Sequence, residues 1–162
     1  MGDAEAKKLG EAIRSDHSAA MHDRRAIASL AVAASLPLAV IALWQIGAVK
    51  RLPDPPLPLF DAEKVNGSGE AYQKLATGDA FLGIGSYFAT ATLAAMGAGD
   101  RGRLLALATG VKVMADAAIS GKLTLDQWTR YRAFCFLCLV SAAATFAMVP
   151  FAVAEMRRAL KA

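Results

Sequence analysis

Four stretches of this sequence are apolar, and polar residues separate them. The stretches cover residues 26–49, 80–98, 104–120 and 133–154. A helix of about 20 apolar residues is long enough to cross the ~30 Å hydrocarbon core of a bilayer. The pattern therefore predicts an all-α protein, built as a bundle of four transmembrane helices.

The polar segments between these stretches differ in length. Residues 50–78 form the longest, and the four prolines between residues 53 and 58 exclude a regular helix there. Asp61 to Leu75 has the pattern of a short amphipathic helix broken by Gly67-Ser68-Gly69. A connection of this size is too large for a tight turn, so we expect it to fold over one mouth of the bundle as an outer cap.

The same pattern divides the chain into three parts. Residues 1–25 are predicted to form a polar N-terminal segment, a surface helix or a frayed tail on the cytoplasmic side. Residues 26–155 form the transmembrane domain, and residues 156–162 form a basic C-terminal tail.

Composition supports a membrane protein. Hydrophobic residues make up 56% of the chain, above the ~45–50% of soluble domains. The net charge of +4 is therefore interpreted as a signal for topology and lipid headgroups, and nucleic acid is not expected as a partner. His17 and His22 are too few ligands for a metal site, which needs three or four converging groups, so no metal is expected.

An even number of spans places both termini on one side of the membrane. Ten basic residues fall on that side and seven on the other, which favours cytoplasmic termini. The ten are Lys7, Lys8, Arg14, Arg24, Arg25, Arg101, Arg103, Arg157, Arg158 and Lys161, and the seven are Lys50, Arg51, Lys64, Lys74, Lys122, Arg130 and Arg132.

Both cysteines of the chain lie in Cys135-Phe136-Leu137-Cys138, where the last apolar stretch begins. Two thiols three positions apart in a helix share one face, and a helix N-terminus stabilises a thiolate. Arg130 and Arg132 are expected to add positive potential. The alternative is that both residues are small apolar side chains of a buried helix.

A further pair of charged residues lies within the third apolar stretch. Lys112 and Asp116 stand at i and i+4, and charges at that depth must face the interior and pair. A structural ion pair is the simpler interpretation. A contact to a lipid headgroup or a proton route is the functional alternative.

A thiol pair at the outer mouth of a bundle is accessible to two kinds of reactant. A protein thiol can exchange with it from the aqueous side, which is oxidising. A quinone dissolved in the membrane can accept its two electrons, provided that an apolar pocket with a few polar groups lies beside the sulfurs.

The sequence resembles the vitamin K epoxide reductase family over residues 26–155. Three features carry the likeness: Cys135-Phe136-Leu137-Cys138 at the start of the last span, Val65 and Ser68 followed by Gly78-Asp79-Ala80-Phe81-Leu82-Gly83, and a large outer segment before a very short inner turn.

The resemblance implies a four-helix bundle around a quinone, ubiquinone or menaquinone, in a bacterial inner membrane. It implies that Cys138 faces the quinone ring and that Cys135 exchanges with an outer electron relay. Ser68 then corresponds to the family's cap serine, and Asp79 falls where some members place a quinone-binding asparagine.

The sequence also departs from the family pattern. The two relay cysteines of the outer segment fall at Ala62 and near Pro56, and the tyrosine that some members carry four residues after the second cysteine is Ala142. A thioredoxin-like periplasmic protein would then act on Cys135 and Cys138 directly.

These features leave three functions open. The first is a quinone-linked thiol/disulfide oxidoreductase. The second is a non-catalytic, diverged bundle that serves as a binding or assembly module. The third, suggested only by Lys112 and Asp116, is a transporter or channel, for which four short spans make a poor pathway.

Overall fold

The computed structural model describes residues 1–73, 75–98 and 101–161 of the chain. Its regular elements are all helices, and the described part contains no strand longer than an isolated β-bridge. The elements are α1 (Asp3–Ser15), α2 (Ala19–Gln45), α3 (Ala62–Asn66), the 3₁₀ helix η1 (Gly69–Tyr72), α4 (Asp79–Ala95), α5 (Arg103–Asp126), the π-helical turn η2 (Gln127–Tyr131) and α6 (Phe136–Lys161). The all-α prediction is confirmed.

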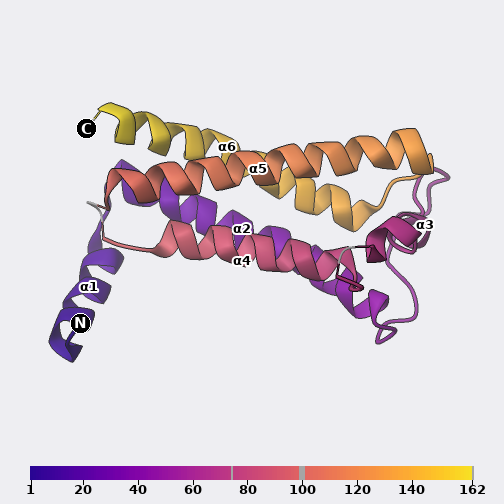
Figure 1. Cartoon of the computed structure of the whole chain (residues 1–162), viewed down its shortest axis with the longest axis horizontal. Helices are drawn as coiled ribbons and strands as arrows, with labels where there is room; N and C mark the ends of the chain where they lie inside the picture. Colours follow the sequence, from indigo (N-terminus) through magenta and orange to yellow (C-terminus); the bar gives the residue numbers. More distant parts are fainter. Residues whose placement is uncertain (74, 99–100, 162) are drawn as a thin grey trace.

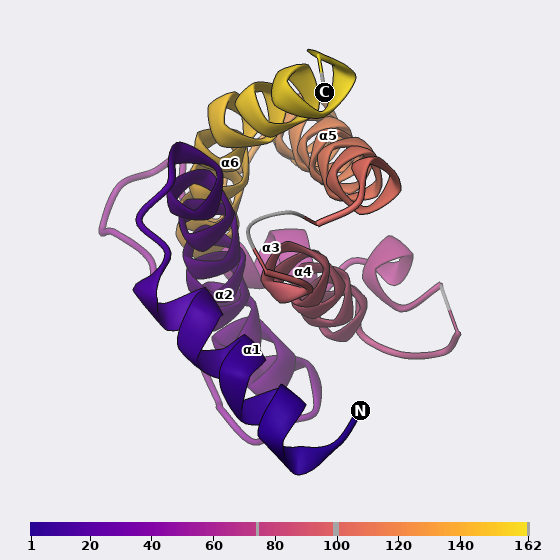
Figure 2. The same cartoon turned by 90° about the vertical axis from the view of Figure 1, so that its left-hand side faces the viewer.

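Four helices run along the long axis of the molecule (Figure 1). Helix α2 packs against both α4 and α6, and α5 packs against α6. Helices α4 and α5 share a smaller contact, although the end-on view shows them side by side (Figure 2). Helix α1 projects from the end where both termini lie, which we call the terminal end. Helix α3 and its flanking segments lie at the opposite end, the cap end.

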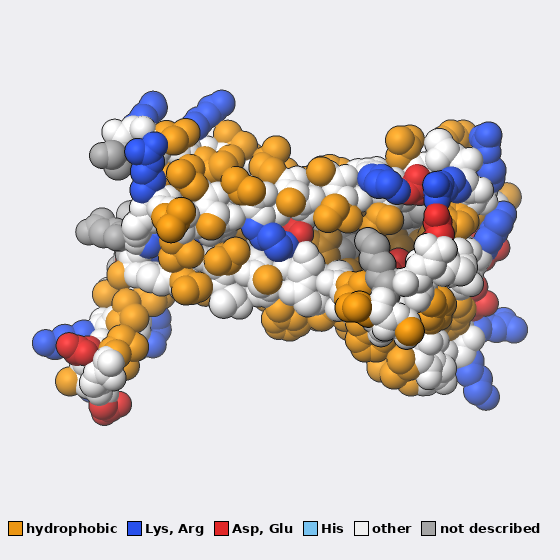
Figure 3. All heavy atoms as spheres, in the orientation of Figure 1, with side chains coloured by type: hydrophobic (Ala, Val, Ile, Leu, Met, Phe, Trp, Pro, Cys, Tyr) orange, Lys and Arg blue, Asp and Glu red, His pale blue; other side chains and the backbone are white. Residues whose placement is uncertain are grey.

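Three of these helices are long and apolar enough to cross a membrane: α2, α5 continued through η2, and α6. Helix α4 has 17 residues and rises roughly 25 Å at ~1.5 Å per residue, slightly less than the hydrocarbon core. The structure is a four-helix bundle in which three helices are long and apolar enough to span a membrane, so the predicted fourth span is not confirmed. Hydrophobic side chains cover much of the middle of the visible face, and basic side chains gather at its two ends (Figure 3).

Small side chains form much of the core. Ala31, Ala34 and Ala152 have no exposed surface, and they pack with the larger Ile27 and Met148. Small residues allow helix axes to approach closely in lipid, where apolar burial itself contributes little to association. This is the packing expected from the alanine-rich composition of the spans.

Several predicted boundaries were wrong. Helix α2 begins at Ala19, well before residue 26, because the Ser18 hydroxyl caps its N-terminus by accepting a hydrogen bond from the Met21 N–H at 3.2 Å. Helix α5 does not end at Ser120 but continues to Asp126 and through η2, so residues 121–132, for which the sequence predicts a loop with a short interfacial helix at residues 124–128, are largely helical.

The first and last segments are also more helical than the pattern of apolar residues indicates. Helix α1 confirms the surface helix within residues 1–25, and α6 extends through the basic residues predicted as a tail. Pro37 and Pro150 lie inside α2 and α6, and both helices continue across them.

The terminal end is closed by a buried arginine. Arg24 is 2% exposed, and its guanidinium donates to the carbonyls of Ala94, Met96, Gly97 and Ala98 at 2.7–3.0 Å. These carbonyls belong to the last turn of α4 and the turn after it. At a helix end such carbonyls have no helical N–H as a hydrogen-bond donor. Arg24 therefore fastens α2 to the end of α4.

The predicted inner turn lies beside this arginine. Gly97 has a φ of +79°, which a residue without a side chain adopts most readily. Arg101 forms a buried ion pair with Glu155 of α6. The middle of the turn, including Asp100, lies outside the described residues, as does Lys74.

Candidate functional site

The two cysteines stand at the start of α6. Cys135 directly precedes the first helical residue, and Cys138 lies in the first turn. Both are free thiols, and the Cys138 backbone N–H donates to Cys135 Sγ at 3.2 Å. The two sulfurs differ in access, since Cys135 has no exposed surface and Cys138 is partly exposed.

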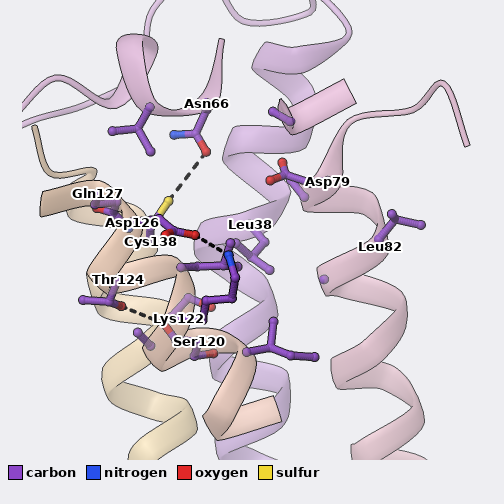
Figure 4. Close-up of a pocket in the computed structure, with 18 of the residues that line it drawn as sticks. Leu38, Asn66, Asp79, Leu82, Ser120, Lys122, Thr124, Asp126, Gln127 and Cys138 are labelled. Carbon is purple, nitrogen blue, oxygen red and sulfur yellow. Dashed lines mark hydrogen bonds and ion pairs between the residues drawn. The ribbon is translucent and has the colours of Figure 1, made fainter. Parts of the chain in front are cut away.

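A cap residue that the sequence did not single out contacts both sulfurs. Asn66 ends α3 and is 5% exposed. Its amide Nδ2 donates to Cys135 Sγ at 3.2 Å, and its Oδ1 accepts from Cys138 Sγ at 3.6 Å. Figure 4 shows Asn66 facing Cys138 from the opposite side of the site. The cap is therefore in direct contact with the thiol pair.

The backbone around Cys135 is fixed on two sides. The Cys135 N–H donates to Gln127 Oε1 in η2 at 2.8 Å. The next N–H, that of Phe136, donates to Asp54 Oδ1 at 3.2 Å, and a β-bridge pairs Phe134 with Phe60 of the cap. These contacts come from η2 and from the proline-rich part of the cap, so both hold the start of α6 in place.

The environment of Cys135 favours its ionised form. The hydrogen bond with the Cys138 thiol, assisted by those from the Asn66 amide and the Cys138 N–H, outweighs burial and lowers the pKa of Cys135, which lies outside the helical span. The arginines expected to do this do not contact either sulfur among the described interactions. Arg130 pairs with carboxylates, and the Arg132 guanidinium lies 5.6 Å from the centre of the Trp128 ring.

A cavity of about 560 Å³ opens beside Cys138. It lies between α4 and α5 beneath the cap, where helix packing is thinnest. Leu38, Leu82 and Ile119 contribute apolar surface, and Ser68 and Asp79 contribute polar groups. Ligand sites in proteins commonly have this volume and this mixture of walls. Cys138 lines the cavity, whereas Cys135 lies behind it.

Ser68 and Asp79 both line the cavity. Asp79 Oδ1 accepts a hydrogen bond from Gln45 Nε2 at 2.9 Å, and Ser68 Oγ accepts from the Tyr131 hydroxyl at 3.1 Å. A Cβ at Gly78 would overlap the Gln45 amide as it stands, so a larger residue there would displace that side chain. The glycine therefore permits the contact that orients Asp79.

Three residues join the cap to η2 across the cavity rim. Glu70 of η1 pairs with Arg130 and accepts from the Tyr131 hydroxyl at 2.8 Å. We call Glu70, Arg130 and Tyr131 the rim latch. The hydrogen bond from Arg130 lowers the pKa of Glu70 below its ordinary value. Glu70 and Tyr131 also line the cavity.

The buried charges of α5 form the predicted ion pair. Lys112 Nζ lies 2.5 Å from Asp116 Oδ1. The Ser86 and Thr90 hydroxyls of α4 donate to the same carboxylate at 2.8 and 2.6 Å. Each of these four polar groups therefore has a hydrogen-bond partner among the others, as a structural role requires. Asp116 also reaches the wall of the cavity.

The residue that replaces a family cysteine is buried near the site. Ala62 has no exposed surface and belongs to the same apolar cluster as Cys135. The resemblance aligns Ala62 with a relay cysteine of the family. Alanine has no thiol and cannot transfer electrons. Within the described residues, no group of three His, Cys, Asp or Glu side chains is arranged to bind a metal.

Sequence reasoning missed Asn66, Gln127 and Tyr131. Gln45, the partner of Asp79, could have been identified as a site residue, because it is the only strongly polar residue of the first apolar stretch. Asn66 gave a weaker signal, a lone amide between Val65 and the glycine that follows it. Gln127 and Tyr131 fall in the connection between the last two apolar stretches, where no regular pattern of apolar residues predicts which way their side chains point.

The model of the vitamin K epoxide reductase family matches residues 24–153, which is most of the chain. No curated protein matches the sequence.

Proposed function

The chain belongs to the vitamin K epoxide reductase family of integral membrane proteins, and from that premise we propose that it is a quinone-dependent thiol:disulfide oxidoreductase. The family suggests thiol–disulfide oxidoreduction linked to quinones in general. For this chain we assign Cys135 and Cys138 as the catalytic pair and Asp79 and Ser68 as quinone-binding residues.

One observation carries the proposal more than any other. The Cys138 thiol lies on the wall of a partly apolar cavity of about 560 Å³, and the Cys135 sulfur stands directly behind it. A ubiquinone or menaquinone ring needs such a cavity, with polar groups for its oxygens and apolar walls for its tail. Asp79 and Ser68 supply polar groups at the same end.

The proposed reaction is balanced by the two thiols and one quinone. Cys135 and Cys138 form one S–S bond and lose two electrons and two protons in total. The quinone gains two electrons and two protons and becomes a quinol. Hydrogen-bond donors near the quinone oxygens stabilise the negative charge that develops there. A carboxylate only accepts hydrogen bonds, so Asp79 contributes as a donor in its protonated form, or else by orienting the Gln45 amide.

The electron donor must come from outside the chain, because the cap has no cysteine. We propose a thioredoxin-like periplasmic protein that exchanges with the pair directly. Cys135 has no exposed surface, so this exchange requires the cap to move away from the start of α6. The rim latch and the Asn66 contacts are the interactions that such a movement breaks.

The proposed topology completes this account. We take α4 as the fourth span, both termini as cytoplasmic and the membrane as a bacterial inner membrane, which puts the cysteines at the outer face. Residues 26–155 form the membrane domain, preceded by the segment 1–25 and followed by the basic segment 156–162.

A thiol count during quinone reduction tests the proposal. The purified protein, reduced and freed of reductant in detergent or liposomes, is mixed with a menaquinone or ubiquinone analogue. We expect two thiols to disappear for each quinol formed, and no reduction by the Cys135→Ala or Cys138→Ala variants. Quinol formation that continues unchanged in both variants would refute it.

A non-catalytic binding module is the second candidate. The absence of relay thiols and the closed position of Cys135 favour it. A module of this kind would keep both thiols when quinone is added, and both would resist water-soluble alkylating reagents in the folded protein.

A further inference from the structure

We propose that Asn66 is a positioning residue that gives the two sulfurs different protonation states, holding Cys135 as the charged sulfur and Cys138 as the protonated one. This inference deepens the proposed function and concerns the same thiol pair. Neither the family match nor the sequence motifs assign a role to Asn66.

The first argument is the direction of the hydrogen bonds. An amide side chain has a donor end and an acceptor end. The donor Nδ2 of Asn66 lies 3.2 Å from Cys135 Sγ, and the acceptor Oδ1 lies 3.6 Å from Cys138 Sγ. A donor stabilises a thiolate, and an acceptor needs a thiol proton, so one side chain favours opposite states at the two sulfurs.

The second argument is that the amide is fixed in this orientation. Nδ2 also donates to the Ala62 carbonyl at 2.8 Å, within α3. A flipped amide would place Oδ1 against that carbonyl, and two acceptors would then face each other without a proton. With only 5% of the residue exposed, water cannot readily replace the lost bond.

The third argument concerns the other groups near the pair. The Cys138 N–H, in the first turn of α6, also donates to Cys135 Sγ. The ionisable groups that face the pair from other elements are Asp54, from the cap, and Asp79, from α4, and both oppose a thiolate. Besides the Cys138 thiol itself, the Asn66 amide is the uncharged side chain that offsets these carboxylates at Cys135.

The division of roles suits the reaction. Cys138 Sγ would first bond to the quinone in the cavity, and the charged Cys135 then attacks Cys138 Sγ, so that the S–S bond forms as the sulfur–quinone bond breaks and the quinol leaves. The electron pair passes to the quinone, one proton comes from the Cys138 thiol, and the proton that Cys135 has already lost is replaced from water. When the cap opens, a thiolate of the external donor attacks Cys135 Sγ in the Cys135–Cys138 disulfide, and the donor becomes oxidised as the pair returns to two thiols.

Thiolate absorbance against pH tests this inference without any quinone. The chain has only two cysteines, so the thiolate signal of the fully reduced protein comes from this pair, and Cys135→Ser identifies the contribution of Cys135. We expect the first thiolate to form below the ordinary thiol pKa of ~8.5. The Asn66→Leu variant removes both hydrogen bonds, and we expect its first thiolate at a pH about one unit higher.

Asn66→Asp is the second variant, because it keeps the shape and the acceptor but replaces the donor with a negative charge. We expect a shift in the same direction and at least as large. Lys64→Ala, at an exposed position of the same short helix, is the matched control and should leave the titration unchanged. Thermal unfolding of each variant shows whether it is folded.

An unchanged first thiolate in folded Asn66→Leu or Asn66→Asp would overturn the inference, as would an equal shift in Lys64→Ala. The proposed function is judged separately by quinone reduction in the unmodified protein. If that reaction is absent but the titrations shift as expected, the function proposal fails and the protonation assigned to the two sulfurs stands.

Discussion

At the terminal end a buried arginine is surrounded by backbone carbonyls, whereas at the cap end a buried asparagine lies against two sulfurs beside a cavity. Arg24 uses its guanidinium nitrogens to satisfy four carbonyls that a helix end leaves free. Asn66 uses one amide to bind two groups that can change their charge. Burial of a polar side chain is therefore not in itself a sign of chemistry.

The surroundings of the two residues explain the difference. The Arg24 site is closed by helix packing, and every partner named for it is a fixed backbone atom. The Asn66 site borders the cavity between α4 and α5, and its partners are thiols. We infer that the terminal end contributes stability and that the cap end contributes reactivity, and the following changes test this separation.

The largest expected effect is the loss of quinone reduction in Cys138→Ser. Serine has the shape of cysteine but cannot form the S–S bond, so we expect the rate to fall to background. The folded state should change by no more than about 1 kcal/mol, because size and backbone contacts are kept. Quinol formation and thermal unfolding, measured on the same preparation, check both expectations. A Cys138→Ser variant that loses its activity because it is also strongly destabilised would contradict the separation of roles.

For Arg24→Leu we expect a loss of stability and no change in the chemistry of the thiols. Removal of the guanidinium leaves one buried and three partly buried carbonyls without their side-chain donor, and we expect a loss of about 3 kcal/mol in unfolding free energy. The fraction that remains folded should still titrate its thiols as the unmodified protein does.

Arg25→Leu is the matched control for this change. Arg25 is the adjacent residue, is exposed, and donates mainly to the Ile13 carbonyl of α1. We expect less than about 0.5 kcal/mol of destabilisation. Denaturant or thermal unfolding in micelles measures both variants, and equal losses would show that the Arg24 contacts contribute little.

Asp79 is expected to have an intermediate effect, confined to the cap end. Asp79→Ala removes the group that pairs with Gln45 and faces the cavity, and we expect about a tenfold lower kcat/KM for quinone, the value of one hydrogen bond. Asp79→Asn keeps an acceptor for Gln45 and adds a donor at every pH, so its rate should equal or exceed that of the unmodified protein. Steady-state kinetics check this. An Asn variant as slow as the Ala variant would exclude a donor role.

The smallest effect is expected at the rim latch. Glu70 has a pKa below its ordinary value of 4.5 because Arg130 stabilises the carboxylate. The stability it contributes is therefore present above pH 4.5 and is lost as the pH falls through the lowered value. Glu70→Gln should lower the Tm slightly at neutral pH, and the difference should disappear in acid. Glu11→Gln, on the exposed α1, should show no difference at either pH.

The bundle was the part of the structure that the sequence predicted best. Long apolar stretches must be helical in a membrane, because every backbone group has to be hydrogen-bonded internally. The boundaries were less certain, since hydrophobicity does not mark where a helix ends outside the bilayer. Helix α5 thus extends past Ser120, and α6 includes residues predicted as a tail.

The candidate site was predicted in part. The spacing of Cys135 and Cys138 identified the pair, but among the described contacts the two arginines expected beside it bind Glu70 and lie against Trp128, and neither is a hydrogen-bond partner of a sulfur. The partner is Asn66, which is 69 residues from Cys135 in the sequence. Such a contact depends on how the cap folds onto α6, and no local pattern encodes that arrangement.

The redox state of Cys135 and Cys138 in intact membranes tests the central proposal most directly. Both thiols are trapped and counted in membranes that contain respiratory quinone and in membranes depleted of it. We predict that the pair is mostly disulfide-bonded when quinone is present and accumulates as free thiols when it is removed. A pair whose redox state is the same in both membranes would contradict electron transfer between these sulfurs and a quinone.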